Sequence, residues 1–209
     1  MRVLVVHPGP DFSVADVHRG WVDALRELGC EVGVYNTNDR LMFYCKALID
    51  TGERDETGHA IVRQAMTEME AIIASMQGLT HACYTFWPDV ILFVSAFFIQ
   101  AGTFQLLRQR NHKLVLLHTE SPYQDDEQLT RAQFADLNLL NDPSNLQRYE
   151  EYGPALYMPH AYRSDVHYPR SGPVNPKLAA DLTFVGTAFK SRIEFFEANK
   201  INMSNIKAN

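Results

Sequence analysis

The sequence predicts an α/β fold in which helices flank a parallel, Rossmann-like sheet. Three short apolar runs, at residues 3–6, 89–94 and 113–117, have the composition of strands that are buried on both faces of a parallel sheet. The segments between them are longer, and their apolar residues recur at helical spacing. Because strand and helix alternate, we expect parallel strands joined by right-handed crossovers.

The first strand and helix are delimited by clear turn signals. The strand at residues 3–6 is broken by HPGP at residues 7–10, and Asp11 or Ser13 can cap the helix that follows. Gly29 ends this helix, and a second strand begins at once. The first turn lacks the G-x-G-x-x-G fingerprint, which disfavours a Rossmann-type NAD site.

The middle of the chain continues the alternation after an irregular stretch. Residues 36–58 are polar and rich in turn residues, and we expect a long loop with one short helix there. Residues 60–79 carry apolar side chains at helical spacing, which predicts a one-sided helix that packs on the core rather than a methionine-rich binding surface. The next predicted elements are a strand at 89–94, a helix at 101–110 and a strand at 113–117.

Residues 134–192 predict a boundary between two domains. A strand at 136–141, a helix that closes at Gly153 and a strand at 155–158 precede a proline-rich crossing. A fresh strand at 182–185 and a helix at 191–197 then open a second α/β domain. The predicted organisation is a first domain at residues 1–168, a linker at 169–180, the start of a second domain at 181–198 and a disordered tail at 199–209.

Composition excludes several classes of protein. The 209 residues are 46% hydrophobic, which excludes a disordered chain, and the formal charge of −6 without a basic run disfavours nucleic-acid binding. The three cysteines are odd in number and lack a C-x-x-C pair, as expected in a reducing compartment. The sequence has neither a signal peptide nor an apolar run of membrane-spanning length, and we expect a cytoplasmic protein.

Polar residues follow three of the predicted strands, at 7–13, at Ser95 and at 118–123. Parallel strands end at one edge of a sheet, where ligands gather. For residues 7–13, separate structural roles in a turn and a helix cap are favoured over a role in a functional site. At 118–120, a histidine and a carboxylate lie two residues apart, and this favours a functional site. The acidic residues 125–127 are expected to form the solvated first turn of a helix, and no metal is needed to explain them.

The order of motifs along the chain resembles the domain crossing of GT-B glycosyltransferases. The matching segments are LLNDPS, a helix that ends in YGP, MPHAY followed by SDVHYP, and a restart at TFVGT. HTESPYQDDEQ and DLTFVGTAFKSRIEFFEA more narrowly resemble the CgeB-like branch, which is related to spore-maturation and phage glycosyltransferases. The resemblance implies transfer of a sugar from a nucleotide-sugar to an unknown acceptor, with no other cofactor.

The resemblance also implies a division of labour, with the acceptor side in the first domain and the donor side in the second. Glu120 would accept the proton of the acceptor hydroxyl, and His118 would orient the acceptor or assist as a neutral imidazole. We expect His7, Gly9, Asp11, His118, Glu120 and Ser121 to converge on one cleft. The implied residues are Glu120, His118 and Asp11 for catalysis, His7, Gly9, Ser13, Ser121 and Tyr123 for the acceptor, and His160, Gly186, Thr187 and Lys190 for the donor.

The end of the chain departs from the family pattern. Residues 199–209, NKINMSNIKAN, lack an apolar strand pattern, which predicts a truncation or frameshift of a longer gene, with a genuine disordered tail as the alternative. Such a fragment is expected to be inactive alone, and Phe195 and Phe196 would favour self-association. Two other interpretations remain open: a non-catalytic sugar- or partner-binding module, and a stand-alone domain whose last helix closes its own sheet.

Overall fold

The computed structural model describes residues 1–7, 11–169, 171–172, 184 and 188–199, and for residues 11–13 it describes only the backbone. The chain divides into two compact units, Met1–Arg163 and Ser164–Asn209. The candidate residues Gly9, Gly186 and Thr187, and residues 200–209 of the tail expected at 199–209, lie outside the described residues.

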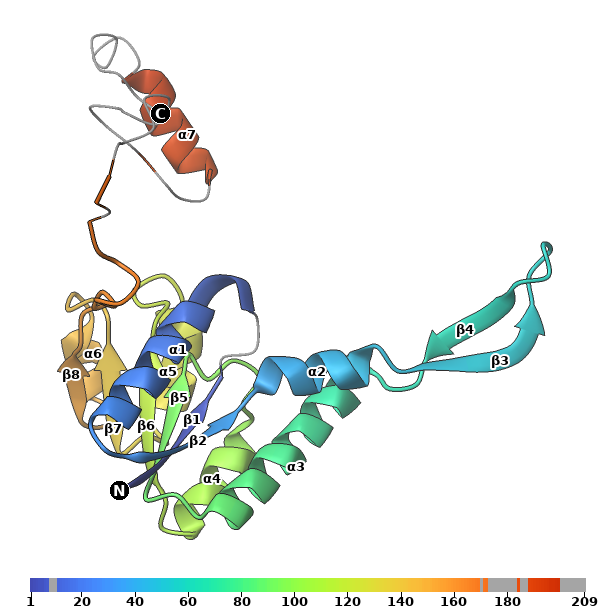
Figure 1. Ribbon diagram of the computed structural model, residues 1–209, viewed down its shortest axis with the longest axis horizontal. Helices are drawn as coiled ribbons and strands as arrows, with labels where there is room; N and C mark the ends of the chain where they lie inside the picture. Colours follow the sequence, from blue (N-terminus) through green and yellow to red (C-terminus); the bar gives the residue numbers. More distant parts are fainter. Residues whose placement is uncertain (8–10, 170, 173–183, 185–187, 200–209) are drawn as a thin grey trace. The chain divides into compact units, whose positions relative to one another are not determined.

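The first unit is built on a six-stranded sheet in which every pair of neighbouring strands is parallel (Figure 1). The strand order is β2-β1-β5-β6-β7-β8, so the order reverses between β1 and β5. This reversal is the switch point beside which open α/β sheets bind ligands. The predicted parallel α/β fold is confirmed. The strands are β1 (Arg2–Val6), β2 (Glu31–Tyr35), β5 (Val90–Val94), β6 (Lys113–His118), β7 (Leu137–Leu140) and β8 (Ala155–Tyr157).

Helices cover both faces of this sheet because its strands are apolar on both sides. Along β1, Val3 and Val5 belong to the cluster that includes Val14 and Val22 of α1, whereas Leu4 and Val6 belong to the cluster of α3 and α4. A third cluster joins α5, α6 and the ends of β7 and β8. The helices are α1 (Asp11–Glu27), α3 (Glu68–Phe86), α4 (Ala101–Gln109), α5 (Asp125–Ala132) and α6 (Leu146–Glu150).

The segment between β2 and α3 differs from the expectation. A helix, α2 (Thr37–Cys45), is followed by an antiparallel hairpin of β3 (Leu48–Arg54) and β4 (Ala60–Gln64). The predicted helix at 60–79 is therefore wrong over its first residues, because α3 begins only at Glu68.

The start of α3 is fixed by a capping box. The backbone N–H of Thr67 donates to Glu70 Oε2 at 2.7 Å, and the backbone N–H of Glu70 donates to Thr67 Oγ1 at 3.3 Å. Two donors of the first turn are thereby satisfied, which ends the extended chain and begins the helix. The T-x-x-E spacing of these residues was visible in the sequence and outweighs the apolar periodicity that runs through Ile61 and Ala65.

The hairpin turn is organised by Asp55. Its Oδ1 accepts from the backbone N–H groups of Thr57 and His59, each at 2.9 Å, and Gly58 takes a φ of +86°. Hydrogen bonds led by that from the Thr57 hydroxyl lower the pKa of Asp55. In Figure 1 the hairpin extends beyond the rest of the first unit, and every residue of both strands is exposed.

The last part of the first unit is held on α1 by an arginine. Arg163 donates to Asp23 Oδ2 at 3.0 Å and lies 3.5 Å from Asp16 Oδ1, and its side chain is only 18% exposed. The chain that leaves β8 is therefore fixed to the body at the last residue of the unit.

The second unit contains α7 (Lys190–Ala198), close to the helix expected at 191–197. Its exposed Lys190 lies 3.7 Å from Glu194 one turn later. The expected strand at 182–185 falls on residues of which the structure describes only Phe184.

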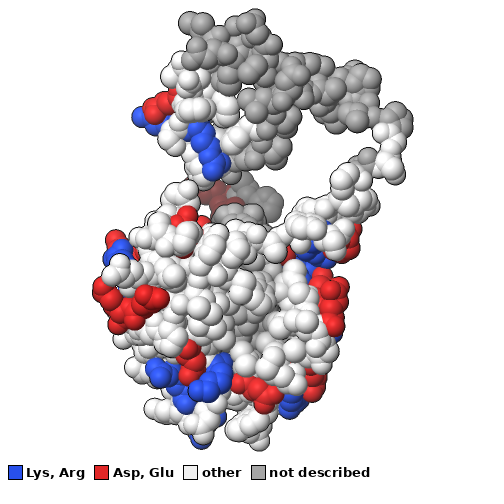
Figure 2. Space-filling model, turned by 90° about the vertical axis from the view of Figure 1, so that its left-hand side faces the viewer, with Lys and Arg blue, Asp and Glu red and all other residues white. Residues whose placement is uncertain are grey.

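Basic and acidic side chains lie close to one another in small groups on the face that Figure 2 shows. All three cysteines are free thiols. Within the described part of the chain, no helix combines the length and the apolar character needed to cross a bilayer.

Candidate functional site

Three polar turns leave the carboxyl edge of the sheet next to one another. His7 follows β1, Ser95 follows β5 and Thr119 follows β6. The register places Val6 beside Phe93, and Val94 beside Leu117, so these turns are neighbours at the switch point. The expectation that the turns after residues 6 and 117 leave the same edge is confirmed.

His7 lies against a second buried histidine on α1. Its backbone N–H donates to Tyr35 O at 2.9 Å, and its ring meets that of His18 edge to face, with centroids 4.8 Å apart. His18 is 8% exposed and hydrogen bonds to the backbone of Val5, while its Nε2 has no partner among the described residues. Burial, and then the neighbouring His7, lower the pKa of His18 to about 4, so the ring is neutral near pH 7.

His18 was missed from the sequence although its position carries a signal. It falls between Val14 and Val22, at four-residue intervals on the buried stripe of α1. A histidine on such a stripe must find a place inside the fold, and the place here is beside the switch point.

The low pKa of His18 predicts a specific dependence of stability on pH. An unfolded histidine titrates near 6.5, so the folded form loses stability as the pH falls from 6.5 towards about 4. The His18→Phe variant has no imidazole to protonate and should lose less stability than the natural chain between pH 7 and pH 4.5. We expect the difference between the two losses to be about 1–2 kcal/mol, a value reduced for solvent screening. Urea denaturation at a series of pH values measures this, and parallel profiles for the variant and the natural chain would contradict it.

The turn after β5 has an unusual backbone. Ser95, Ala96 and Phe98 have positive φ values of +62°, +46° and +62°, a region that residues other than glycine seldom occupy. The Ser95 N–H donates to Leu117 O at 2.8 Å, and the Ser95 and Thr119 hydroxyls hydrogen bond to each other. Such backbone strain is concentrated at functional sites. The sequence showed only the polar character of Ser95.

His118, the last residue of β6, is held by β7 and α6. It is buried, its ring centroid lies 4.7 Å from that of Tyr149, and its Nε2 lies 2.8 Å from Asn138 Oδ1. Asn138 Nδ2 donates to Ala132 O, so Oδ1 accepts and His118 carries its proton on Nε2. Burial lowers the pKa of His118. The His118 ring therefore contacts Tyr149 of α6 and Asn138 of β7, whereas the His7 ring contacts His18 of α1.

Asp125 corrects the expectation of a solvated acidic turn. The first turn of α5 is acidic as predicted, but Asp125 is only 4% exposed. Its Oδ1 accepts from the Tyr149 hydroxyl at 2.7 Å, and its Oδ2 accepts from Asn145 Nδ2. Two donors from α6 and its N-terminal turn replace the lost hydration, which allows the carboxylate to be buried. Burial, reinforced by Asp125, raises the pKa of Tyr149 well above its usual range.

The remaining predicted residues differ in their surroundings. Glu120 is partly buried in the turn after β6, and its carbonyl accepts from Tyr123 N at 2.7 Å. Ser121 is buried, and Tyr123 is 88% exposed. Asp11 and Ser13 lie in the first turn of α1 with side chains outside the description, and His160 and Lys190 are exposed.

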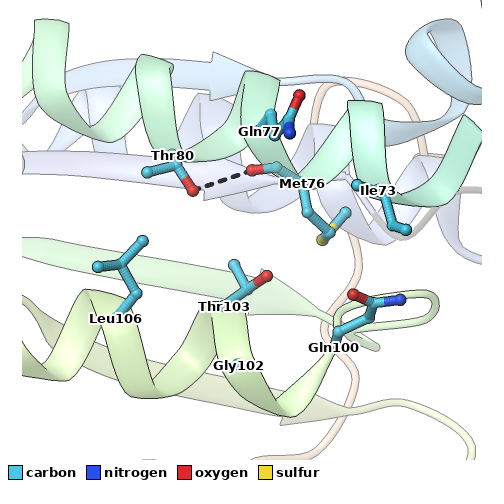
Figure 3. A pocket seen from close by; sticks show the side chains of 8 residues that line it. All are labelled: Ile73, Met76, Gln77, Thr80, Gln100, Gly102, Thr103 and Leu106. Atoms are coloured by element: carbon cyan, nitrogen blue, oxygen red, sulfur yellow. Dashed lines mark hydrogen bonds between the residues drawn. The ribbon is translucent and has the colours of Figure 1, made fainter. Parts of the chain in front are cut away.

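Two further features of the described residues bear on ligand binding. An open groove of about 380 Å³ lies between α3 and α4, and none of the predicted site residues lines it (Figure 3). In this groove the Thr80 hydroxyl donates to Met76 O at 2.9 Å. Within the described residues no group of three or more His, Cys, Asp or Glu side chains is placed to hold a metal ion. The groove is lined by Ile73, Met76, Gln77, Thr80, Gln100, Gly102, Thr103 and Leu106.

Comparison with known proteins finds similarity in structure and none in sequence. No family model and no curated protein sequence matches the chain. A sucrose-phosphate synthase from Thermosynechococcus elongatus aligns with 81% of this chain at 14% identity and a TM-score of 0.52, and a shorter chain of that synthase aligns with 77% at 14% identity and a TM-score of 0.48. The alignments cover 50% and 90% of those chains, so this chain spans half the length of the longer one. At this identity the longer match shows a shared fold: the chain has a Rossmann-like α/β fold, which it shares with that synthase.

Proposed function

We propose that this chain is the acceptor-side part of a GT-B glycosyltransferase of the CgeB-like branch. The observation that carries the proposal is the polar edge at the switch point of a sheet whose fold is shared with sucrose-phosphate synthase. There His7, His18, Ser95 and Thr119 form two side-chain contacts, His7 with His18 and Ser95 with Thr119. The chain would bind the hydroxyl-bearing acceptor at this edge.

Sugar transfer needs a base for the acceptor hydroxyl and hydrogen-bond partners that hold the acceptor in place. Glu120 is the proposed base, because this residue is partly exposed in the turn after β6 and follows Thr119 directly in the sequence. The Nε2 of the neutral His18 has no partner among the described residues but is buried, so a sugar hydroxyl would reach it only by displacing the atoms that cover it. Hydroxyls and neutral imidazoles recognise an uncharged polyol without a charge being buried.

The donor would be a nucleotide-sugar, and its diphosphate would be bound by the second domain. His160, Gly186, Thr187 and Lys190 are the proposed donor residues, where backbone N–H groups at a helix N-terminus would face the phosphates. The protein would need no cofactor besides the nucleotide-sugar. It would act in the cytoplasm, where nucleotide-sugars serve as co-substrates.

The test separates the acceptor from the donor. We expect the purified chain to bind members of a glycan panel in NMR titrations, and to release no nucleotide from UDP-, GDP- or TDP-sugars above a control without protein. Thr119→Val should weaken glycan binding about tenfold through loss of one hydrogen bond, and the exposed Thr130→Val serves as the matched control. Nucleotide release by the chain alone, or absence of glycan binding by the folded chain, would overturn the proposal.

A further inference from the structure

The hairpin of β3 and β4 has no packing beneath it in the described part of the chain. All its residues are exposed, and its branched apolar side chains include Ile49, Ile61 and Val62, with exposed fractions of 43%, 40% and 50%. A two-stranded hairpin in water is marginal without a third strand or a covered face. Exposed apolar residues gathered in one place mark surfaces that bind another protein.

The free edge of β4 follows from its hydrogen bonds. Three backbone groups in and beside β4 form hydrogen bonds towards β3. His59 O accepts from Asp55 N, Ile61 O accepts from Thr51 Oγ1, and Ala65 N donates to Ala47 O. Because the direction alternates along a strand, the N–H and C=O groups of Ala60, Val62 and Gln64 point away from β3. No other described strand pairs with β4.

The two edges of the hairpin are protected to different degrees. The β3 edge carries Asp50, Glu53 and Arg54, and its register shifts between Asp50 and Arg54, where Gly52 has a φ of +82°. Charges and bulges are the devices by which sheets block edge pairing. The β4 sequence, AIVRQ, is regular and has a single charge, at Arg63. The edge open to pairing is therefore that of β4.

We propose that β4 pairs with β4 of a second copy of this chain, antiparallel about a two-fold axis at Val62. In this register each Val62 exchanges both backbone hydrogen bonds with the partner's Val62, and Ala60 lies opposite the partner's Gln64. Arg63 lies opposite the partner's Ile61, so no like charges face each other. The product is a four-stranded sheet. This inference does not depend on the proposed function.

The faces of this four-stranded sheet also favour a second copy as the partner. Ile49 lies opposite Arg63 in the hairpin, so Ile49, Ile61 and Arg63 share one face. About the two-fold axis each Ile61 lies diagonal to the partner's Ile61, and each Ile49 lies diagonal to the Ile61 of its own chain. These diagonal contacts cover exposed apolar surface on this face. A two-fold interface uses the same patch on both subunits, as this register does.

Sedimentation velocity over a concentration series tests the proposal with one matched pair of variants. The chain should sediment at twice its chain mass, and Val62→Pro should shift it to the monomer, because proline removes the outward N–H while the bonds to β3 remain. Val62→Thr keeps the N–H and a β-branched side chain, and should remain dimeric. A chain that is monomeric throughout, or a dimer that survives Val62→Pro, would overturn the proposal.

Cysteine cross-linking tests the register and does not depend on how the proline variant folds. Directly opposite residues in the expected pair have Cα atoms about 5.5 Å apart, which suits a disulfide, so Val62→Cys should give a covalent dimer on mild oxidation. Gln64→Cys is the control, since the Cα atoms of its two copies would be about 14 Å apart. A mixture of Ala60→Cys and Gln64→Cys chains should cross-link. Equal cross-linking of Val62→Cys and Gln64→Cys, or none by Val62→Cys, would exclude this register.

Discussion

Tyr149→Ala is expected to lower the free energy of unfolding by about 3–5 kcal/mol. Tyr149 is fully buried in the cluster that joins α5, α6, β7 and β8, and its ring lies against His118. Truncation leaves a cavity in that cluster and also removes the hydroxyl that donates to the buried Asp125. Urea denaturation followed by circular dichroism measures the change.

Two further variants separate the causes of that loss. Tyr149→Phe keeps the ring and removes only the donor to Asp125, so we expect a smaller loss of about 1–3 kcal/mol. Tyr152, three residues later, is 46% exposed, and Tyr152→Ala should change stability by less than about 0.5 kcal/mol. If Tyr149→Ala costs no more than Tyr152→Ala, the α5–α6 cluster does not stabilise the first unit as described.

Glu120→Gln is expected to lower turnover by about two to four orders of magnitude in an active enzyme that contains this chain and a donor-binding domain. The amide keeps the size of the side chain but cannot accept the proton of the acceptor hydroxyl. The decrease should appear in kcat with little change in the KM for the acceptor, because proton transfer occurs in the transition state. Steady-state kinetics with the natural acceptor measure both quantities.

Asp126→Asn is the matched control for this prediction. Asp126 is an exposed carboxylate of the same acidic stretch, and it lies 2.6 Å from Arg148 Nη2. Its neutralisation should leave turnover within about twofold, since exposed ion pairs contribute little. Near-normal turnover of Glu120→Gln, with the fold intact, would remove Glu120 from the role of base.

The parallel sheet could be predicted because each strand is apolar on both faces. The runs at 3–6, 89–94 and 113–117 match β1, β5 and β6 to within one residue at each end. The hairpin could not be found in this way, because its strands have no buried face to impose an alternating pattern. Its remaining signals were local: a turn at Asp55 and Gly58, and the T-x-x-E box before α3.

The site was predictable in position more than in detail. Topology alone placed the turns after β1 and β6 at one edge, as the register confirms. The contact between His7 and His18 depends on how α1 packs, and the positive φ values of Ser95, Ala96 and Phe98 occur at residues other than glycine, so the sequence carries no signal for them. Both arise from tertiary packing, which overrides local preference. The proposed roles of Glu120 and of the donor residues stay predictions.

The pairing of β1 with β5 has a consequence for synthesis on the ribosome. Val3 pairs with Val90, and the residues between them form β2, three helices and the hairpin. The inner edge of β1 therefore stays open until β5 has left the exit tunnel, which at 5–20 residues per second takes roughly 4–20 seconds. During that interval β1 and β2 form an incomplete sheet whose open edge is apolar, and this is the stage at which a nascent chain needs a chaperone.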